Sequence, residues 1–345
     1  MANIRQVAAE AGVSIATVSR VLSGDPNFSV KEDTVKKIHE AAERLGYKLP
    51  PAKHLQYHFG CILSHTADKY SDPFFIDIID AMETECRRQR AGIVVSRSYK
   101  ELDDPVVLED LLNSDLDGLF VMERISQEIM DKIKARIPHI ILIDKDDPFY
   151  EFDCIGFDHR TANFQVMNEL FRRGYKRIAM ISGSSPGTPL QNTIRHATYL
   201  EAHFLAGITP DYNLIKDCHW DLSLCEQQVK ELMEMDERPE AIFAGSDSLA
   251  SVVLGTLFSM NIRCPEDVGV IGFNNIQLSA HMVPPLTTIE IPTNDIGRTA
   301  VKRMMRIIAD NDSAVRKILF PTKYIDRKSL RFIDKENSDE VLHRD

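Results

Sequence analysis

The sequence lacks the features that would place it in a membrane or in the common enzyme families. No apolar run approaches the roughly 20 residues that a membrane span needs, and the first residues lack the apolar core of a signal peptide. No Gly-x-Gly-x-x-Gly motif follows the first expected strand, no P-loop lysine motif is present, and no Ser/His/Asp or metal-binding triad can be assembled. We therefore expect a cytoplasmic protein that is not an enzyme and that needs neither a cofactor nor a metal.

Cysteine is scarce, and its spacing carries no binding pattern. The six cysteines are scattered along 345 residues without Cys-x-x-Cys spacing. We expect most of them to be small buried side chains in a reducing compartment, rather than zinc ligands or disulfide partners. The sequence has no repeat of solenoid period, and its length and its 43% of hydrophobic residues predict two or three globular domains.

Positive charge is also scarce, except near the N-terminus. The whole chain has a net charge of −11, but residues 1–58 hold eight Lys and Arg against six Asp and Glu, a net charge of +2. The remainder holds 33 basic against 46 acidic residues, a net charge of −13. Because phosphates would repel such an acidic body, any contact with nucleic acid must be confined to the N-terminal segment.

The first 48 residues predict three short helices. Asn3 can cap the first helix, which Gly12 ends as a C′ glycine, and Ser14 can cap the second. Ser29 and Glu32 form a capping box that opens the third helix. A helix, a tight glycine turn, a second helix and a third that packs on both make a helix-turn-helix.

The start of the second helix would enter the major groove of DNA. Arg20 can make a bidentate contact with guanine, and Ile15 or Ala16 can meet a thymine methyl group. Short hydroxyls suited to phosphate or base contacts stand at Ser14, Thr17 and Ser19. Taken alone, the pattern also fits an ordinary three-helix bundle in which Arg20 is a solvated surface charge.

The residues of this segment resemble the signature of the lac/gal repressor (LacI/GalR) family of bacterial transcription regulators. The resemblance is carried by Val7-Ala8, Ala11-Gly12-Val13-Ser14 and Thr17-Val18-Ser19-Arg20-Val21-Leu22. It implies that Ile4 also belongs to the DNA-binding surface. It continues almost to residue 332 through Asp158, Gly174, Arg177-Ile178, Asp247, Gly272-Phe273 and Pro284-Pro285-Leu286-Thr287-Thr288-Ile289.

The segment after residue 48 would be the hinge of such a regulator. In the family this segment is a helix whose leucine wedges into the minor groove and kinks the DNA. Leu55 aligns with that leucine, and Ala52 aligns with the small residue one turn earlier. The Pro50-Pro51 pair departs from the usual Arg- and Asn-rich hinge, so a plain linker remains the alternative.

The body from residue 59 onward alternates short apolar runs with amphipathic stretches, which is typical of parallel βαβ units. The expected strands are Phe59–Leu63, Ile93–Ser96, Gly118–Met122, Ile140–Asp144, Arg177–Ser182, Ala241–Ala244 and Val268–Phe273. Because one open sheet cannot hold so many units, we expect an α/β fold of two Rossmann-like lobes, similar to periplasmic binding proteins.

The expected parts of the chain are a helix-turn-helix domain over 1–48, a hinge over 49–58, a two-lobed domain over 59–333 (lobes roughly 59–157 plus 287–318, and 158–286 plus 319–333) and a flexible tail over 334–345.

Ligands of such sheets bind beyond the carboxyl ends of the strands. This rule selects Asp144, Ser246-Asp247 and Asn274 as candidate effector-binding residues. Two of them have simpler alternatives, since Asp247 could be a helix cap and Asp144 could stabilise a turn with Lys145.

The family resemblance adds further effector-binding candidates. It places sugar contacts on Asp144, Phe157, Arg195, Trp220, Ser246 and Asn274, with Phe74 flanking the ligand. Ser246 stands where many members have Asn, and Asn274 where most have Asp, so the hydrogen-bonding capacity differs from the family pattern. A core role for Trp220 is the alternative.

The sequence therefore predicts a repressor of a sugar-utilisation operon, released by a small carbohydrate inducer, with a galactoside-like sugar favoured. A homodimer would place two helix-turn-helix domains on a pseudo-palindromic operator. The alternatives are a regulator that senses a phosphorylated sugar or a partner protein, and a sugar-binding protein without a regulatory role.

Overall fold

The computed structural model describes residues 4–14, 17, 18, 21, 32–45, 55–63, 73–145, 151–184 and 188–332. The chain divides into two compact units, residues 1–57 and 58–345. None of the helices among the described residues is long and apolar enough to cross a membrane.

The N-terminal unit packs α1 (Ile4–Ala11) against α3 (Glu32–Arg44). Gly12 follows α1 with φ +67°, a left-handed conformation that glycine adopts without strain and that ends the helix. The unit has its own small apolar core, formed by Val7, Ala8, Val18, Ile38, Ala41 and Ala42. The expected caps at Asn3 and Ser29 lie outside the described residues.

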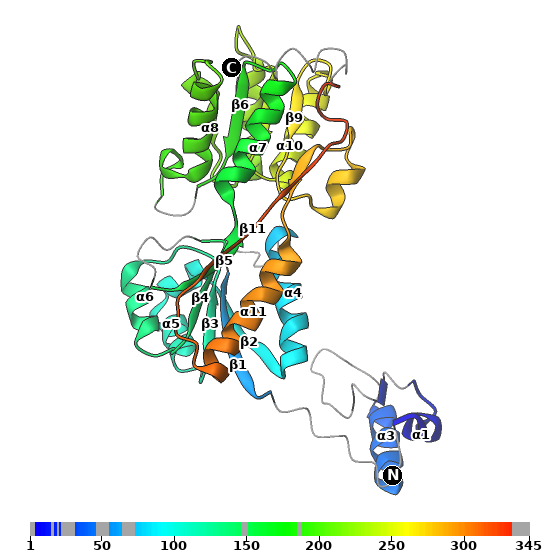
Figure 1. Cartoon of the computed structure of the whole chain (residues 1–345). Helices are drawn as coiled ribbons and strands as arrows, with labels where there is room; N and C mark the ends of the chain where they lie inside the picture. The colour runs from blue at the N-terminus through cyan, green and yellow to red at the C-terminus, as the bar shows by residue number, and fades with distance from the viewer. Residues whose placement is uncertain are drawn as a thin grey trace. The chain divides into compact units, whose positions relative to one another are not determined.

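The first lobe of the larger unit is a six-stranded sheet in the order β11-β5-β4-β3-β1-β2, and the pairings from β11 to β1 are parallel. Figure 1 shows α4 and α11 side by side on this lobe. At Gly297 in α11 a Cβ would lie 2.4 Å from the carbonyl oxygen of Ile78 in α4, so the glycine permits this close packing. The elements are β1 (Tyr57–Leu63), α4 (Pro73–Gln89), β2 (Ala91–Ser98), α5 (Pro105–Leu112), β3 (Gly118–Val121), α6 (Gln127–Lys134), β4 (Ile140–Ile143), β5 (Asp153–Phe157), α11 (Thr293–Asp310) and β11 (Lys317–Phe320).

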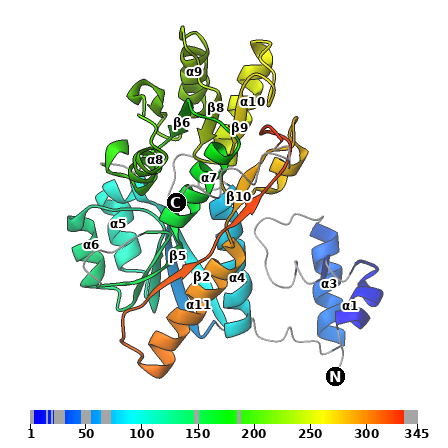
Figure 2. The same cartoon turned by 45° about the horizontal axis from the view of Figure 1, so that its top comes forward.

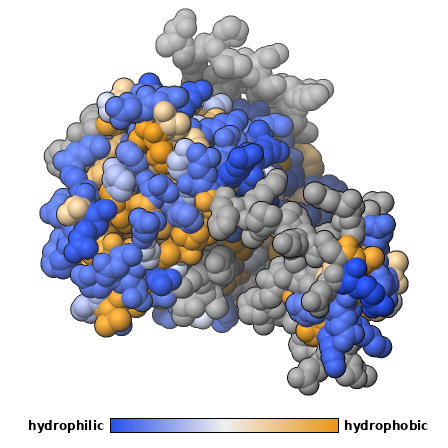
Figure 3. Space-filling view, turned by 90° about the horizontal axis from the view of Figure 1, so that it is seen from below, coloured by the Kyte–Doolittle hydropathy of each residue, from blue (hydrophilic) through white to orange (hydrophobic). Residues whose placement is uncertain are grey.

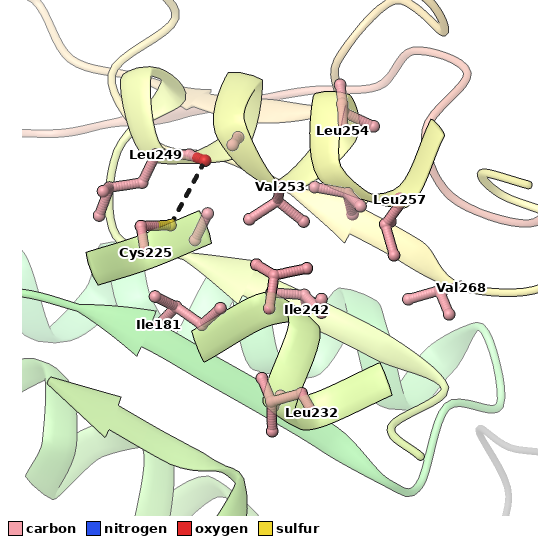
Figure 4. Packing of buried hydrophobic residues seen from close by; sticks show 14 of the residues in the cluster. Ile181, Cys225, Leu232, Ile242, Leu249, Val253, Leu254, Leu257 and Val268 are labelled. Atoms are coloured by element: carbon pink, nitrogen blue, oxygen red, sulfur yellow. Dashed lines mark hydrogen bonds between the residues drawn. The ribbon is translucent and has the colours of Figure 1, made fainter. Parts of the chain in front are cut away.

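The second lobe is a four-stranded parallel sheet in the order β7-β6-β8-β9, together with an antiparallel pair of β10 and β12. Figure 4 shows how its core packs, with side chains of α9 and α10 such as Leu232 and Val253 meeting Ile181 and Ile242 of the sheet. The elements are α7 (His159–Arg172), β6 (Ile178–Ser182), α8 (Ile194–Leu205), β7 (Ile215–Asp217), α9 (Leu222–Met233), β8 (Ala241–Ala244), α10 (Asp247–Ser259), β9 (Gly269–Ile271), β10 (Thr288–Glu290) and β12 (Lys323–Ile325).

The chain crosses between the two lobes three times, between β5 and α7, between β10 and α11, and between β11 and β12 (Figures 1 and 2). The backbone N–H of Asp158 in the first crossing donates to the carbonyl oxygen of Phe320 at the third. The last two crossings lie a few residues after the expected boundaries at 286/287 and 318/319. The second crossing lies after residue 287 because Thr287 forms a β-bridge with Ile271 of the second lobe. The third lies after residue 320 because Phe320 pairs with Phe157 of the first lobe.

The α/β class with two parallel sheets confirms the sequence prediction, and each expected strand is present with small shifts of its ends. The surface seen in Figure 3 is largely hydrophilic, with apolar side chains in scattered groups. All six cysteines are free thiols, and five of them are buried.

Candidate functional site

A cavity of about 590 Å³ lies between the two lobes of the larger unit. Its walls come from segments beyond the carboxyl ends of strands in both sheets, including the residues after β4, β5, β6, β8 and β9. This is the edge at which parallel α/β sheets bind their ligands. Seven of the eight effector-binding residues expected from the sequence line the cavity: Phe74, Asp144, Phe157, Arg195, Trp220, Ser246 and Asn274.

Arg195 in the first turn of α8 is one of the cationic residues that line the cavity. Its Nη1 donates to Ser182 Oγ at 2.7 Å, and its Nε donates to Asn163 Oδ1 at 3.3 Å. Burial lowers the pKa of the guanidinium to about 10, and the nearby Asp144 carboxylate opposes this effect. The group therefore stays charged at neutral pH, and neutral partners hold its orientation. Arginine fixed in this way can donate to a ligand as a rigid fork.

Aromatic rings surround this guanidinium. Its Cζ atom lies 5.1 Å from the ring centre of Phe273 and 5.6 Å from that of Trp220. Phe157, which is buried, packs on Phe273 with 5.9 Å between ring centres. Flat apolar faces beside a hydrogen-bonding fork suit a ligand that has both C–H faces and polar edges.

The loop after β7 holds Trp220 in the wall of the cavity. Trp220 and His219 both have left-handed backbone conformations, with φ of 61° and 50°. Two consecutive non-glycine residues in this region store conformational strain, which the surrounding contacts must offset. The Trp220 indole thus has a defined place in the wall.

Asp144, which directly follows β4, is held from several sides. Its φ is 56°, and its N–H donates to the carbonyl oxygen of Ile155 at 2.9 Å. Its Oδ1 lies 2.7 Å from Nε2 of His159, and its side chain is only 10% exposed. The structure therefore fixes the carboxylate in the cavity wall, and Lys145 instead pairs with Glu123 at 3.2 Å.

Two further polar residues come from the second lobe. Ser246 caps α10, since its Oγ accepts from the N–H of Leu249 at 3.2 Å. Asn274 has φ of 110°, and its backbone N–H donates to the carbonyl oxygen of Ile289 at 2.8 Å. Both side chains line the cavity.

Asp247 is the expected effector-binding residue that the structure places elsewhere. It is fully buried and lies outside the cavity lining. Its carboxylate accepts from Thr288 Oγ1 at 2.6 Å and from the N–H of Ile276 at 2.9 Å. Burial raises its pKa to about 7, although these hydrogen bonds oppose the shift. Asp247 therefore ties the start of α10 to the segments around β10, which is a structural role.

Several lining residues were not expected from the sequence. His159 and the Glu123–Lys145 pair line the cavity, while Asn163 and Ser182 orient Arg195 from behind. His159 directly follows Asp158, which was recognised as a family landmark, so its position next to β5 could have indicated a role. The contacts of Asn163 arise only when α7 packs against α8, and no local pattern reveals them.

Part of the expected DNA-binding surface lies within the described residues. Ser14 Oγ accepts from the N–H of Thr17 at 3.1 Å, so Ser14 forms the expected cap. Leu55 is 39% exposed, and Ile4 begins α1. Ile15, Ala16, Ser19, Arg20 and Ala52 lie outside the described residues.

Comparison with protein-family models gives two matches. Residues 3–49 match the model "Bacterial regulatory proteins, lacI family", and residues 167–330 match the model "Periplasmic binding protein-like domain". The first match covers the helices of the N-terminal unit, and the second covers most of the second lobe and α11.

Individual relatives match over nearly the whole chain. The transcriptional repressor MelR of Bacillus subtilis is 29% identical over 97% of this chain and 99% of its own length. Catabolite control protein A of Priestia megaterium is 29% identical over 88% of this chain and 91% of its own. The repressor PurR of Vibrio atlanticus is 28% identical over 97% and 100%.

Solved structures share the fold. The complex of the transcriptional regulator CelR with cellobiose has a TM-score of 0.72 at 22% identity and covers 95% of this chain and 100% of its own. The lac repressor dimer bound to operator and the anti-inducer ONPF has a TM-score of 0.70 at 22% identity and covers 96% and 99%.

Proposed function

We propose that this chain, a DNA-binding transcriptional repressor of the lacI family of bacterial regulatory proteins, is released from its operator by a small carbohydrate in the cavity. The observation that carries the proposal is the cavity itself. It sets a charged Arg195 fork and the Asp144 carboxylate beside the faces of Trp220 and Phe273. Sugars present hydroxyl groups at their edges and C–H groups on their faces, so they match both kinds of group.

The release would follow from differential affinity. The cavity is lined from both lobes, so an effector that contacts both favours one arrangement of the lobes over others. Operator affinity then falls if that arrangement is incompatible with two helix-turn-helix domains on DNA. The effect is limited by the difference in effector affinity between the two states.

A neutral, galactoside-like sugar is the finer proposal. Two cations of the cavity wall have acidic partners, since Lys145 pairs with Glu123 and Arg160 pairs with Glu201. The Arg195 guanidinium donates to the neutral side chains of Ser182 and Asn163. The nearby Asp144 carboxylate stabilises its positive charge and so raises its pKa, against the effect of burial. A ligand that offers both donors and acceptors without a net charge suits this arrangement.

A phosphorylated sugar is the second candidate. One observation favours it, because Arg124 and Lys317 line the same cavity as Arg195. Guanidinium groups recognise phosphate in a bidentate manner. A phosphate group would then lie between these side chains.

We propose that the second helix of the N-terminal unit binds DNA and that Arg20 contacts guanine. The other DNA-contacting residues of this unit would be Ile4, Ile15, Ala16, Thr17 and Ser19. A single domain of this kind buries too little surface for tight binding, so we propose a homodimer on a pseudo-palindromic operator. The first lobe offers a surface for pairing. Its strand β2 lies at the edge of the sheet, and Val94 of this strand is 46% exposed.

Thermal unfolding of the full chain with a panel of ligands tests the proposal. The panel holds monosaccharides, cellobiose, lactose and other disaccharides, and sugar phosphates. A rise of the unfolding temperature with a neutral sugar supports the finer proposal, because a ligand that binds only the native state stabilises it. A rise with sugar phosphates alone favours the second candidate, and no rise with any member contradicts a carbohydrate effector.

A further inference from the structure

His159 and Asp144 form a hydrogen bond that spans the two lobes. Asp144 directly follows β4 of the first lobe, and His159 is the first residue of α7 in the second lobe. The His159 Nε2 and Asp144 Oδ1 atoms are 2.7 Å apart. A second side-chain contact across the cleft, from Arg124 Nη1 to Thr188 Oγ1, is longer at 3.4 Å.

The imidazole is fixed in this position by more than the hydrogen bond. Its ring stacks on Phe157, with 3.9 Å between ring centres and 33° between planes. Asp158, the residue before it, caps α7 by accepting from the N–H of Thr161 at 3.0 Å, which sets the backbone from which His159 extends. The side chain remains 32% exposed, and it lines the cavity.

The carboxylate is fixed equally well. The left-handed backbone of Asp144 and its bond to Ile155 set the direction of the side chain. On the neighbouring strand, a Cβ at Gly156 would lie 3.2 Å from the Asp144 Cα atom. The absence of a side chain there lets β5 approach closely. Both partners are therefore positioned before any ligand binds.

We propose that His159 is a positioning residue of the cavity: its bond to Asp144 Oδ1 ties the second lobe to the first and occupies one acceptor site of the carboxylate that a ligand would otherwise use. The carboxylate therefore offers a ligand more open acceptor sites on Oδ2 than on Oδ1, and it favours a hydroxyl that approaches Oδ2. The part that concerns ligand selection rests on the proposed function. The part that concerns the lobes stands without it.

Trp220 provides a probe that needs no ligand. It is the only tryptophan of the chain and it lines the same cavity, so acrylamide quenching of its fluorescence reports how open the cleft is. His159→Phe keeps a ring to stack on Phe157 but loses the hydrogen bond. His159→Gln keeps an N–H donor but loses the ring.

We expect quenching to increase in His159→Phe, because loss of one charge-assisted hydrogen bond shifts the balance of closed and open forms by about fivefold or more. His159→Gln should stay close to the unmodified protein. His139→Phe serves as the control, since this histidine lies outside the cavity lining. Equal quenching in the unmodified protein and in His159→Phe would overturn the proposal.

A double-variant cycle separates the bond from a local effect of the phenylalanine. In an Asp144→Asn background the carboxylate partner is gone, so adding His159→Phe should change the quenching much less than it does alone. An undiminished change would show that the bond is not the cause. Titration with cellobiose and lactose then tests the proposed function separately: if neither alters the fluorescence of any variant, a carbohydrate ligand is contradicted, while the quenching result still decides the role of His159.

Discussion

Gly183, directly after β6, lies against the Trp220 indole so closely that no other residue fits there. A Cβ at Gly183 would stand 2.5 Å from Cγ and Cδ1 of Trp220, and equally close to its backbone nitrogen. Real Cβ contacts are never that short, and the backbone nitrogen cannot swing away as a flexible side chain could. The position of Trp220 therefore depends on the absence of a side chain at Gly183, in the segment that follows β6.

Gly183→Ala should displace Trp220 and weaken ligand binding by about tenfold or more, as a shift of about 1 Å in a binding group commonly does. The emission maximum of the single tryptophan should move to longer wavelength as the indole becomes more exposed. Gly255→Ala in α10 is the matched control, because nothing lies within 4 Å of a Cβ at that position. An unchanged spectrum and affinity in Gly183→Ala would refute the close contact.

Arg195→Ala should abolish the stabilisation by ligand while operator binding persists. The variant removes the Arg195 guanidinium, which donates hydrogen bonds to Ser182 and Asn163. The cavity then lacks the donor group that we propose binds the ligand. Arg195→Lys keeps the charge without the planar fork and should recover little affinity. The measurement is thermal shift with the best ligand of the panel, beside operator binding by fluorescence anisotropy. Full ligand response in Arg195→Ala would move the binding site elsewhere.

The pKa of Asp247 predicts a pH-dependent stability. Burial raises this pKa to about 7 in the folded protein, well above the ordinary range of an aspartic acid. The folded state therefore binds the proton more tightly than the unfolded state, and the free energy of unfolding falls as the pH rises from about 4 to about 7. Between pH 5 and 7 this contribution should fall by on the order of 2 kcal/mol.

Asp247→Asn removes this titration and keeps a side chain of the same shape. Urea unfolding of both proteins at pH 5, 6 and 7 isolates the contribution of Asp247, because the other titrating groups are common to both. The difference in stability between the two should change with pH in the stated direction. Parallel pH curves would mean that Asp247 stays charged throughout the range.

The sequence predicts the cavity better than it predicts the contacts that hold it. Asp144 and Asn274 follow buried strands, so a local rule about strand ends finds them. Asp247 obeys the same rule yet turns inward, since Thr288 and Ile276 lie where its carboxylate is buried. Only the packing of segments about 30 to 40 residues away decides between the two outcomes.

The missed strand β5 shows the same limitation. Its first residue, Asp153, is a buried carboxylate, which is unusual at the start of a strand. Arg303 of α11 satisfies it with a contact of 2.8 Å. This partner stands 150 residues further along the chain, so no local pattern could have revealed that Asp153 is compatible with a buried strand.

Arg20→Ala should reduce discrimination between operator and random DNA and leave ligand stabilisation intact. A bidentate contact to guanine contributes about 1–3 kcal/mol of discrimination, which corresponds to about fivefold to 150-fold in relative affinity. Arg44→Ala is the control, because Arg44 ends α3 and pairs with Glu10 at 3.2 Å. Full discrimination in Arg20→Ala would disprove the assignment of the second helix to the major groove.

The most direct test of a ligand-controlled repressor is a reciprocal binding measurement on the full chain. Operator affinity is measured by anisotropy with and without the ligand that gives the largest thermal shift, using an operator selected from random DNA. Ligand affinity is measured with and without that operator. The account predicts that each lowers the affinity for the other by the same factor, of about fivefold or more. Operator and ligand affinities that are independent of each other would contradict it.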